Sequence, residues 1–541
     1  MTKADLVFVN ANILTLDDAF PRATALAAGG GRLLAVGDDT AVRDFITSRT
    51  TVIDLAGKTV LPGFNDSHLH FLYPGTLMRV NVLGSGSIDE LIGTVRETVA
   101  AVPPGTPLDG WGWDQNLFPD QRYPDRQVLD AAAPLHPLLL IHVGGHAAAA
   151  NSRMLALAGI TRDTPDPDGG HIDRDAAGEP TGVLRESATQ IVMRYLYPPD
   201  GVFTVSDEGL KEALRRTMLK AVACGLTSAT TDDARFVGGF ERCFGAYREL
   251  WAEGAPMVRT YQLIYHPELE QLMAAGLRTG DGDERLRVGA IKIFQDGSFM
   301  AQTAALQEPY CDKPDSRGML IHPQADFDAI VAKAHAAGMQ VAVHVIGDAG
   351  IVSGLDAIAR AQAAHPRPDA RHRLVHYEVL TEDILRRTRE LGVAVDIQPK
   401  FVTSQGHVVE GRVGPERARL TFPWQMVLQH GIAAAGSSDY PVEPFAPLPG
   451  IWAAVNRTTD RRPDETFLPG ERLSVPEALR LFTSGGAYAT FEENIKGTLT
   501  PGKLADIAVL SDDPTTVPPE TIRDLRVEMT VINGRIVYQA G

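Results

Sequence analysis

Two histidines stand two residues apart in the stretch VLPGFNDSHLHF, residues 60–71. Side chains at positions i and i+2 of a strand point to the same face, so His68 and His70 can direct their ring nitrogens at one point. Neutral imidazole is a good ligand for zinc and related divalent ions. The pair therefore indicates a metal site that begins at the end of this strand.

Four further polar residues end apolar runs elsewhere in the chain. They are Lys292 in AIKIF, His344 in VAVHVIGD, His376 in LVHYEV and Asp439 in GSSDYP. A single strand histidine is more often a hydrogen-bonded core residue than a ligand, but four histidines, a lysine and an aspartate at strand ends together favour a metal centre. An ammonium would be repelled by metal ions, so the lysine fits such a centre only as a carbamate, an anionic oxygen ligand made from its amine and carbon dioxide.

Short apolar runs alternate with alanine-rich helical stretches through the middle of the chain. After the strand before His68, the runs lie at 226–233, 258–266, 287–298, 340–350, 373–379, 393–401 and 432–441. Between them, segments such as 207–225 and 326–338 have apolar residues at helical spacing and end at glycine. Eight such units predict an α/β fold, a TIM-type (β/α)8 barrel over residues 61–494, with site residues at the C-terminal ends of its strands.

Two parts of the chain lie outside this alternation. Residues 1–60 and 495–541 contain short strand-like runs with Gly, Asn and Asp turns, so we expect both termini to build one small β-sandwich domain. A large insertion, residues 72–205, follows the first barrel strand, where it can act as a lid or a pocket wall. Within it, Ser87-Ile-Asp-Glu90 predicts a helix start with a capping box. Segment 166–179 lacks the spacing of a calcium loop and is interpreted as turns.

The insertion and the loops must supply the contacts with the substrate. Trp111, Trp113 and Asp114 in GWGWDQN and His146 in GGHAAAANS are the candidates in the insertion. The alternative is that the tryptophans form the insertion's own core. Asp296 in FQDGS is a further candidate, either as a substrate contact or as a group that orients a metal ligand.

The motifs together resemble those of the amidohydrolase superfamily. PGFNDSHLHF, IKIFQDGS, VHVIGDAG, VHYEVL, GSSDYPVEP and GTLTPGKLADIAVL are similar to the amidohydrolase-3, or YtcJ-like, group of metal-dependent hydrolases, which includes N-substituted formamide deformylases. The resemblance extends from about residue 5 to residue 538. It implies a binuclear centre with two divalent ions, zinc in the first place.

The resemblance also implies how the ligands divide between the two ions. His68, His70 and Asp439 would hold the more buried ion, and His344 and His376 the more exposed one. A carboxylated lysine at position 292 would bridge them.

Such a centre implies hydrolysis by a metal-bridging hydroxide, because metal binding lowers the pKa of water towards about 7. Asp439 would take the proton and pass it to the leaving nitrogen. The leading hypothesis is a metal-dependent amidohydrolase that cleaves an amide-type C–N bond, as in an N-acyl or N-formyl amine. An ester or carbamate hydrolase using the same centre and a non-catalytic barrel stay open as alternatives. The sequence around GSS (436–438) lacks a G-x-S-x-G elbow, which disfavours an acyl-enzyme route.

Composition narrows the partners and the compartment. The formal net charge of −17, with no local Lys/Arg cluster, disfavours nucleic-acid binding. No run reaches the roughly 20 apolar residues of a membrane span, and the N-terminus lacks a signal-peptide pattern. Three scattered cysteines fit a reducing cytoplasm. We therefore expect a cytoplasmic protein with a small-molecule substrate, and the family resemblance adds a homodimer to these expectations.

Overall fold

Eight parallel strands form the central sheet of the protein. The computed structural model describes residues 2–73, 80–100, 102–196 and 207–541. The strands are β8 (Phe64–Leu69), β15 (Leu226–Thr231), β16 (Arg259–Tyr265), β17 (Leu286–Phe294), β18 (Val341–Val345), β19 (Arg373–His376), β20 (Ala394–Ile397) and β21 (Ala434–Gly436). Their order in the sheet is β21-β20-β19-β18-β17-β16-β15-β8, so neighbours in the sheet follow one another in the barrel sequence.

The two end strands of this sheet meet just beyond its ladder. The Asp439 N–H donates to the His68 carbonyl over 2.9 Å, and the His70 N–H donates to the Tyr440 carbonyl over 2.8 Å. The sheet is thereby curled into a nearly closed barrel. The predicted barrel architecture is confirmed at this level.

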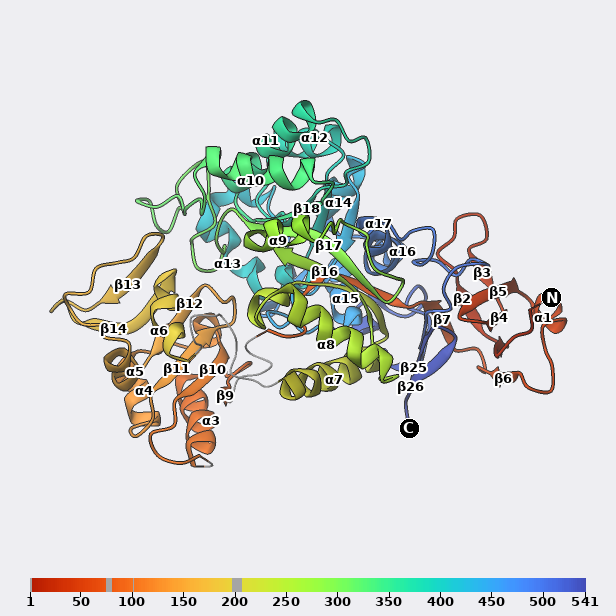
Figure 1. Ribbon diagram of the computed structural model, residues 1–541, viewed down its shortest axis with the longest axis horizontal. Coiled ribbons are helices and arrows are strands. Elements are labelled where there is room, and N and C mark those ends of the chain that lie inside the picture. Colours follow the sequence, from red (N-terminus) through yellow and green to blue (C-terminus); the bar gives the residue numbers. More distant parts are fainter. Residues whose placement is uncertain (1, 74–79, 101, 197–206) are drawn as a thin grey trace.

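Helices follow the strands and cover the outside of the sheet (Figure 1). From α7 to α14 they are α7 (Asp207–Ala223), α8 (Phe240–Ala252), α9 (Leu269–Ala274), α10 (Gln324–Ala336), α11 (Asp348–Ala364), α12 (Glu382–Glu390), α13 (Pro399–Ala418) and α14 (Trp424–Gln429). After β21 come α15 (Pro447–Asn456), α16 (Val475–Arg480) and α17 (Gly486–Ala489). The acids Asp207 and Glu208 in the first turn of α7 complement its N-terminal dipole. The predicted helices at 207–225 and 326–338 are confirmed to within two residues at each end.

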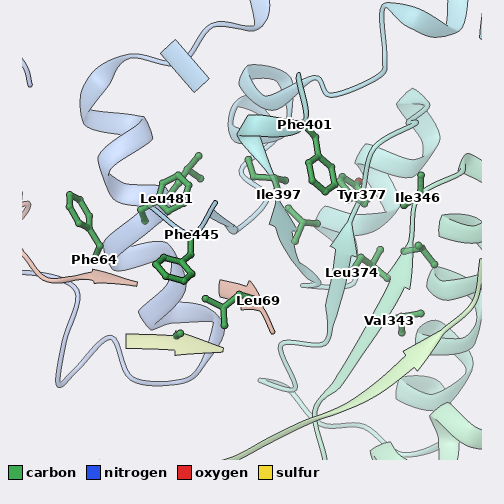
Figure 2. Close-up of a cluster of buried hydrophobic side chains, with 14 of the residues drawn as sticks. Phe64, Leu69, Val343, Ile346, Leu374, Tyr377, Ile397, Phe401, Phe445 and Leu481 are labelled. Carbon is green, nitrogen blue, oxygen red and sulfur yellow. The ribbon is translucent and has the colours of Figure 1, made fainter. Parts of the chain in front are cut away.

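The main hydrophobic core lies between the sheet and these helices, and Figure 2 shows part of it around Val343, Leu374 and Ile397. A smaller cluster belongs to the alternate residues of the strands: Tyr261, Leu263, Ala290, Ala342 and Val375. Because side chains alternate across a strand, these residues face the barrel interior while their neighbours face the helices. The same alternation places Lys292 and His344, two residues after Ala290 and Ala342, inside the barrel at its C-terminal end.

Strands from both ends of the chain lie together at one side of the barrel (Figure 1, red and blue). One sheet, in the order β5-β4-β1-β6, contains β1 (Leu6–Val9), β4 (Ala25–Gly29), β5 (Arg32–Gly37) and β6 (Thr51–Asp54). The second, in the order β26-β25-β24-β7-β2-β3, contains β2 (Asn12–Leu14), β3 (Arg22–Ala23), β7 (Thr59–Pro62), β24 (Ile507–Leu510), β25 (Val527–Ile532) and β26 (Arg535–Gln539). Both sheets contribute to one hydrophobic cluster, for example through Phe8 and Val60.

The insertion after β8 forms a sheet of its own, on the side of the barrel opposite the terminal strands (Figure 1). Its strand order is β13-β14-β12-β11-β10-β9. The elements are β9 (Val80–Asn81), α3 (Ile88–Ala100), β10 (Leu108–Trp113), α4 (Arg126–Ala132), β11 (Leu138–His142), β12 (Ala147–Ala150), α5 (Ser152–Leu157), β13 (Gly170–Arg174), β14 (Pro180–Glu186) and α6 (Ala188–Leu196). Both ends of the predicted insertion, at 74–79 and 197–205, lie outside the described residues.

Two local predictions for the insertion need correction. Segment 166–179 is not only turns, because β13 pairs antiparallel with β14 and forms a hairpin around the turn at Asp175. The capping box is only half formed: the Glu90 N–H donates to Ser87 Oγ over 3.2 Å, but the Glu90 carboxylate accepts from Gly86 N–H instead.

None of the helices within the described ranges is long and apolar enough to cross a lipid bilayer.

Candidate metal centre

Two neighbouring strands bring three potential metal ligands together at the C-terminal end of the barrel. His68 lies in β8 and His70 directly after it, while Asp439 follows β21. Asp439 Oδ1 lies 3.2 Å from His70 Nε2 and 3.4 Å from His68 Nε2. The three ligand atoms all lie within 4.8 Å of one another, and all three side chains are buried. The two histidines therefore converge on one point, together with a carboxylate from the far end of the barrel sheet.

The hydrogen bonds of these side chains leave lone pairs that face one another. His70 Nδ1 lies 2.9 Å from the Asp232 carbonyl, and a neutral ring that donates to this oxygen keeps its Nε2 lone pair towards Asp439. Burial, together with the charge of Lys292, holds the pKa of His68 well below its usual range, so this ring is also neutral. Two imidazoles and a carboxylate oxygen at this separation fit a cation between them.

Asp439 is ionised in this arrangement. Burial acts to raise the pKa of its carboxyl group, but the neighbouring side chains of His70, His376 and Lys292 outweigh burial, and its pKa lies below the usual value. A carboxylate with two neutral imidazoles is a donor set that suits zinc and similar divalent ions.

Lys292 extends from β17 into the same space. Its side chain is fully buried, and Nζ lies 3.1 Å from His68 Nε2. Burial lowers the pKa of Lys292 to about 8, although the acids Asp232 and Asp439 act in the opposite direction. An appreciable fraction of this amine is therefore uncharged near neutral pH.

His344 and His376 lie beside this group, at the ends of β18 and β19. Their ring centroids are 4.4 Å apart, and the His376 ring is 5.6 Å from that of His68. His344 Nε2 lies 3.1 Å from the Gly297 carbonyl, and His376 Nδ1 lies 3.1 Å from Gln398 Oε1. Each of these nitrogens donates to an oxygen, which leaves the other ring nitrogen with its lone pair. Burial lowers the pKa of both rings, to about 4 for His376, so both are neutral potential ligands.

The backbone is strained at two of these positions. His376 has a φ of 78° and Asp439 a φ of 57°, and Tyr377 follows at 52°. Non-glycine residues rarely adopt this left-handed region, and such residues cluster at functional sites. The left-handed turns after β19 and β21 thus cost conformational free energy, and they direct the side chains of His376 and Asp439 towards the site.

The potential ligands lie on the walls of two adjoining cavities. The wall of the larger, of about 330 Å³, includes all six predicted metal-site residues: His68, His70, Lys292, His344, His376 and Asp439. The smaller, of about 90 Å³, shares His344, His376 and Asp439 with the larger one and extends towards α13 and β11. Residues of the insertion complete both walls, so the insertion covers the C-terminal end of the barrel.

His146, a predicted substrate contact, lines both cavities. Its Nδ1 lies 3.0 Å from Glu186 Oε2, and its ring centroid is 5.8 Å from that of His344. Burial acts to lower the pKa of His146, but the charge of Glu186 outweighs it and the pKa lies above its usual value. The structure thus brings a protonatable ring next to the potential metal ligands, and its contact with a substrate stays a prediction.

Trp113, the second predicted substrate contact, lines neither cavity. It is fully buried in a hydrophobic cluster of the insertion, where its Nε1–H donates to the Leu140 carbonyl over 2.9 Å. Its ring packs edge-on against His142 at 4.7 Å, and His142 and Asp114 are the neighbours that reach the smaller cavity. The structure therefore places Trp113 behind the cavity wall, because its face of β10 is turned to the helices of the insertion.

Asp296, the third candidate, is also absent from both cavity walls. Its buried carboxyl group accepts from the backbone N–H groups of Ala305, Ile346 and Gly347 at 2.8 to 3.0 Å. Asp296 Oδ1 lies 3.8 Å from His344 Nε2. The carboxyl group ties the loop after β17 to the end of β18. Its role as a substrate contact or as a group that orients a metal ligand stays a prediction.

The sequence patterns did not point to several polar residues of the cavity walls, among them Arg235, Glu186 and Glu378. Arg235 stacks between the rings of Phe236 and Phe294, with its guanidinium carbon 4.2 and 4.5 Å from their centroids. Glu186 comes from β14, and Glu378 follows His376 by two residues. Arg235 and Glu378 follow barrel strands directly, as the metal-site residues do, and this position is the signal that could have found them.

Comparison with known proteins places these features in a family. Residues 51–538 match the model of the amidohydrolase family. The chain is 36% identical over 493 residues to "Putative amidohydrolase YtcJ" of Bacillus subtilis (strain 168), which covers 91% of each chain. It is 29% identical to N-substituted formamide deformylase of Arthrobacter pascens, over 99% of this chain and 98% of that one.

A solved structure is similar over almost the whole chain. The crystal structure of an uncharacterized metal-dependent hydrolase from Pyrococcus horikoshii OT3 superimposes with a TM-score of 0.76 and 27% sequence identity. The match covers 95% of this chain and 99% of the other.

Proposed function

The chain belongs to the amidohydrolase family of metal-dependent hydrolases, and from this premise we propose that it hydrolyses an amide-type C–N bond of a small molecule. The observation that carries the proposal is the convergence of His68, His70 and Asp439 on one point of a buried cavity. Two imidazole rings and an ionised carboxylate form a donor set that suits a divalent cation. An N-acyl or N-formyl amine is the proposed substrate class.

Two divalent ions, zinc in the first place, fit the residues of this cavity. His68, His70 and Asp439 would hold one ion, and His344 and His376 the other. When bound, such ions supply a water of lowered pKa and polarise the carbonyl group of the substrate. Gln398 and the Gly297 carbonyl fix the rings that face the second ion.

Lys292 is proposed to carry a carboxyl group on Nζ and to bridge the two ions. Its fully buried position beside His68 supports this role, because an ammonium would be both desolvated and repelled there. The lowered pKa supports it further, since carbon dioxide reacts with the uncharged amine.

The chain's own groups would move the proton of the reaction. Asp439 is an ionised carboxylate at the junction of both cavities, so it can accept a proton from the attacking water and deliver it to the leaving nitrogen. His146 faces the same junction from the insertion and is placed to donate a hydrogen bond to the substrate.

The amide bond is preferred because a relative of nearly full length is named for the deformylation of N-substituted formamides. An ester or carbamate hydrolase with the same centre is the second candidate, because the site chemistry does not depend on a nitrogen leaving group. A non-catalytic barrel is disfavoured by the six metal-site residues on one cavity wall.

Metal analysis and matched substrates test this proposal. The purified protein should contain close to two divalent ions per chain. It should hydrolyse N-benzylformamide faster than the uncatalysed reaction in buffer. The rate of hydrolysis of benzyl formate, its ester counterpart, is compared with that of the amide to separate an amide hydrolase from an ester hydrolase. His344→Ala and His376→Ala should lose nearly all turnover yet stay folded, whereas His430→Ala, at the end of α14 and outside both cavities, should not. Full activity of both site variants with two ions still bound would contradict the assignment.

We also propose a domain division, a cellular location and partners for the protein. The two terminal sheets, residues 1–60 and 495–541, are proposed to act as a β-sandwich domain beside the barrel at 61–494, with 72–205 as its lid. A cytoplasmic location, a small-molecule partner and a homodimer are proposed with them.

A further inference from the structure

The smaller cavity contains polar side chains for which the proposed metal site has no use. They belong to the wall of this cavity: Asp114, His142, Glu378, Gln405 and Glu443. The same cavity is bounded by His344, His376 and Asp439. A substrate whose amide bond lies at these three residues would therefore extend one of its halves into this space.

Glu378 is the least satisfied of these side chains. It is 1% exposed, and neither of its carboxyl oxygens has a hydrogen-bond partner among the described residues. Burial raises the pKa of its carboxyl group well above the usual range, and the nearby acids Asp296 and Asp439 raise it further. Burying a carboxyl group without a hydrogen bond or a counter-charge costs free energy, so a structure keeps one where a ligand completes it.

Glu443 is a buried carboxylate on the wall of the same cavity that does have a cationic partner. It is nearly as deeply buried as Glu378, but Lys400 Nζ lies 3.1 Å from its Oε2. Within the described part of the chain, Glu443 thus has a cation as its partner, whereas Glu378 forms no ion pair.

Two further wall groups have unused hydrogen-bonding capacity. His142 Nδ1 accepts from the Gly144 N–H over 3.0 Å, so its proton is on Nε2, which has no partner among the described residues. Gln405 Oε1 is likewise without a partner in the described part of the chain. Together with Glu378, the wall offers three acceptor oxygens and one donor. A group rich in N–H donors complements this set best.

We infer that Glu378, assisted by Gln405, binds a protonated amine on the leaving half of the substrate. The substrate class is then an N-acyl or N-formyl amine with a second, cationic nitrogen a few carbons from the amide, as in a monoacylated diamine. This inference rests on the proposed hydrolase function for the place of the amide bond. The metal-site residues set the bond that is cleaved, and Glu378 selects what the leaving nitrogen carries.

Binding of two isosteric amines tests the inference without any turnover. 1,4-Diaminobutane and n-pentylamine differ only in the replacement of one ammonium by a methyl group, and neither can be hydrolysed. With the metal-loaded protein, calorimetry should give at least a tenfold lower Kd for the diamine. Glu378→Gln keeps the shape of the side chain and should abolish this difference. Glu416→Gln makes the same charge change on the exposed surface of α13 and should preserve it.

Equal affinities in the parent protein, or a diamine preference that survives in Glu378→Gln, would overturn the inference. Gln405→Met provides a second variant, which should reduce the preference a few-fold by removing one acceptor. Turnover of N-acetyl-1,4-diaminobutane against N-pentylacetamide then separates the two proposals. If the diamine preference holds but neither amide is hydrolysed, the binding site stands and the hydrolase assignment falls.

Discussion

The barrel interior contains two layers of buried polar side chains, and they differ in how their charges are balanced. In the lower layer, Arg373 and Asp396 are both fully buried and form a two-pronged ion pair, with distances of 2.9 and 2.6 Å. The remaining capacity of the Arg373 guanidinium goes to the Ser67 carbonyl and Thr230 Oγ1. Every charge in this layer meets its partner within the chain.

The upper layer, at the C-terminal ends of the same strands, is incomplete. His68 Nδ1 and both oxygens of Glu378 lack hydrogen-bond partners among the described residues. The potential ligand atoms of His68, His70 and Asp439 converge within 4.8 Å of one another. The strained backbone at His376 and Asp439 belongs to this layer as well.

The difference between the layers indicates that the lower layer stabilises the fold, whereas the upper layer is arranged to bind a ligand. A buried ion pair that is complete can be held without outside help, whereas removal of one partner leaves an uncompensated charge. Several acceptor groups that lie close together repel one another, and they keep their positions only because the packing of the surrounding barrel fixes them. Variants in the two layers should therefore fail in different ways.

The largest effect is expected in the upper layer at Lys292. Lys292→Ala removes the proposed bridge between two metal ions, which contribute several kcal/mol of transition-state stabilisation, so kcat/KM should fall by at least about 10³-fold. The melting temperature of the metal-free protein should change by only a few degrees, because among the described residues the amine contacts His68 but forms no ion pair. Steady-state kinetics, metal analysis and calorimetry measure the three quantities.

Rescue separates the bridging role from a structural one. Acetate or propionate should restore part of the activity of Lys292→Ala by filling the vacated position with a carboxylate. Lys292→Arg should stay inactive, because it keeps a positive charge in that position. A Lys292→Arg variant as active as the parent protein would contradict the bridge.

A matched pair of aspartates tests the contrast between the layers directly. Asp396→Asn leaves the Arg373 charge buried without its partner and should cost about 3–5 kcal/mol of unfolding free energy. Asp439→Asn should cost the metal-free protein under about 1.5 kcal/mol, the net contribution of one hydrogen bond, because asparagine tolerates the left-handed backbone there. Denaturant unfolding of both variants gives the comparison, and equal losses would show that the layers do not differ.

Metal binding should show the opposite order in the same pair. Asp439→Asn should lose tightly bound metal and activity, while Asp396→Asn, where it is folded, should keep both. The two variants thus act as controls for each other.

The barrel and its metal-site residues were predictable because both signals are local. An apolar run that ends in a polar residue marks a strand and the region of its C-terminal end at once. Lys292 and His344 lie near the ends of β17 and β18, and His376 ends β19. Eight such runs in alternation with helices leave few topologies other than a barrel.

The insertion was less predictable because its contacts are not local. The sheet order β13-β14-β12-β11-β10-β9 decides which face of β10 meets the helices, and therefore that Trp113 packs inside while Asp114 reaches the cavity. Segment 170–174 has the Gly and Asp residues of a turn, but pairing with β14 makes it a strand. Glu378 follows a left-handed turn, so strand alternation could not place it.

The smallest expected effect concerns pH and the assembly of the upper layer. Only the uncharged amine of Lys292 reacts with carbon dioxide, and a lowered folded-state pKa means that this form is present above the pKa and lost below it. With the pKa at about 8, the uncharged fraction rises about tenfold between pH 7 and pH 9 and then levels off. For an unperturbed lysine, with a pKa of about 10.4, the uncharged fraction would rise about a hundredfold over the same interval.

Metal-stripped protein should therefore regain activity on addition of zinc about ten times faster at pH 9 than at pH 7, at constant dissolved carbon dioxide. A hundredfold acceleration would place Lys292 in water rather than in a dry cavity. Reactivation that ignores both pH and carbon dioxide would remove the carbamate from the upper layer and leave His68, His70 and Asp439 as a site for one ion.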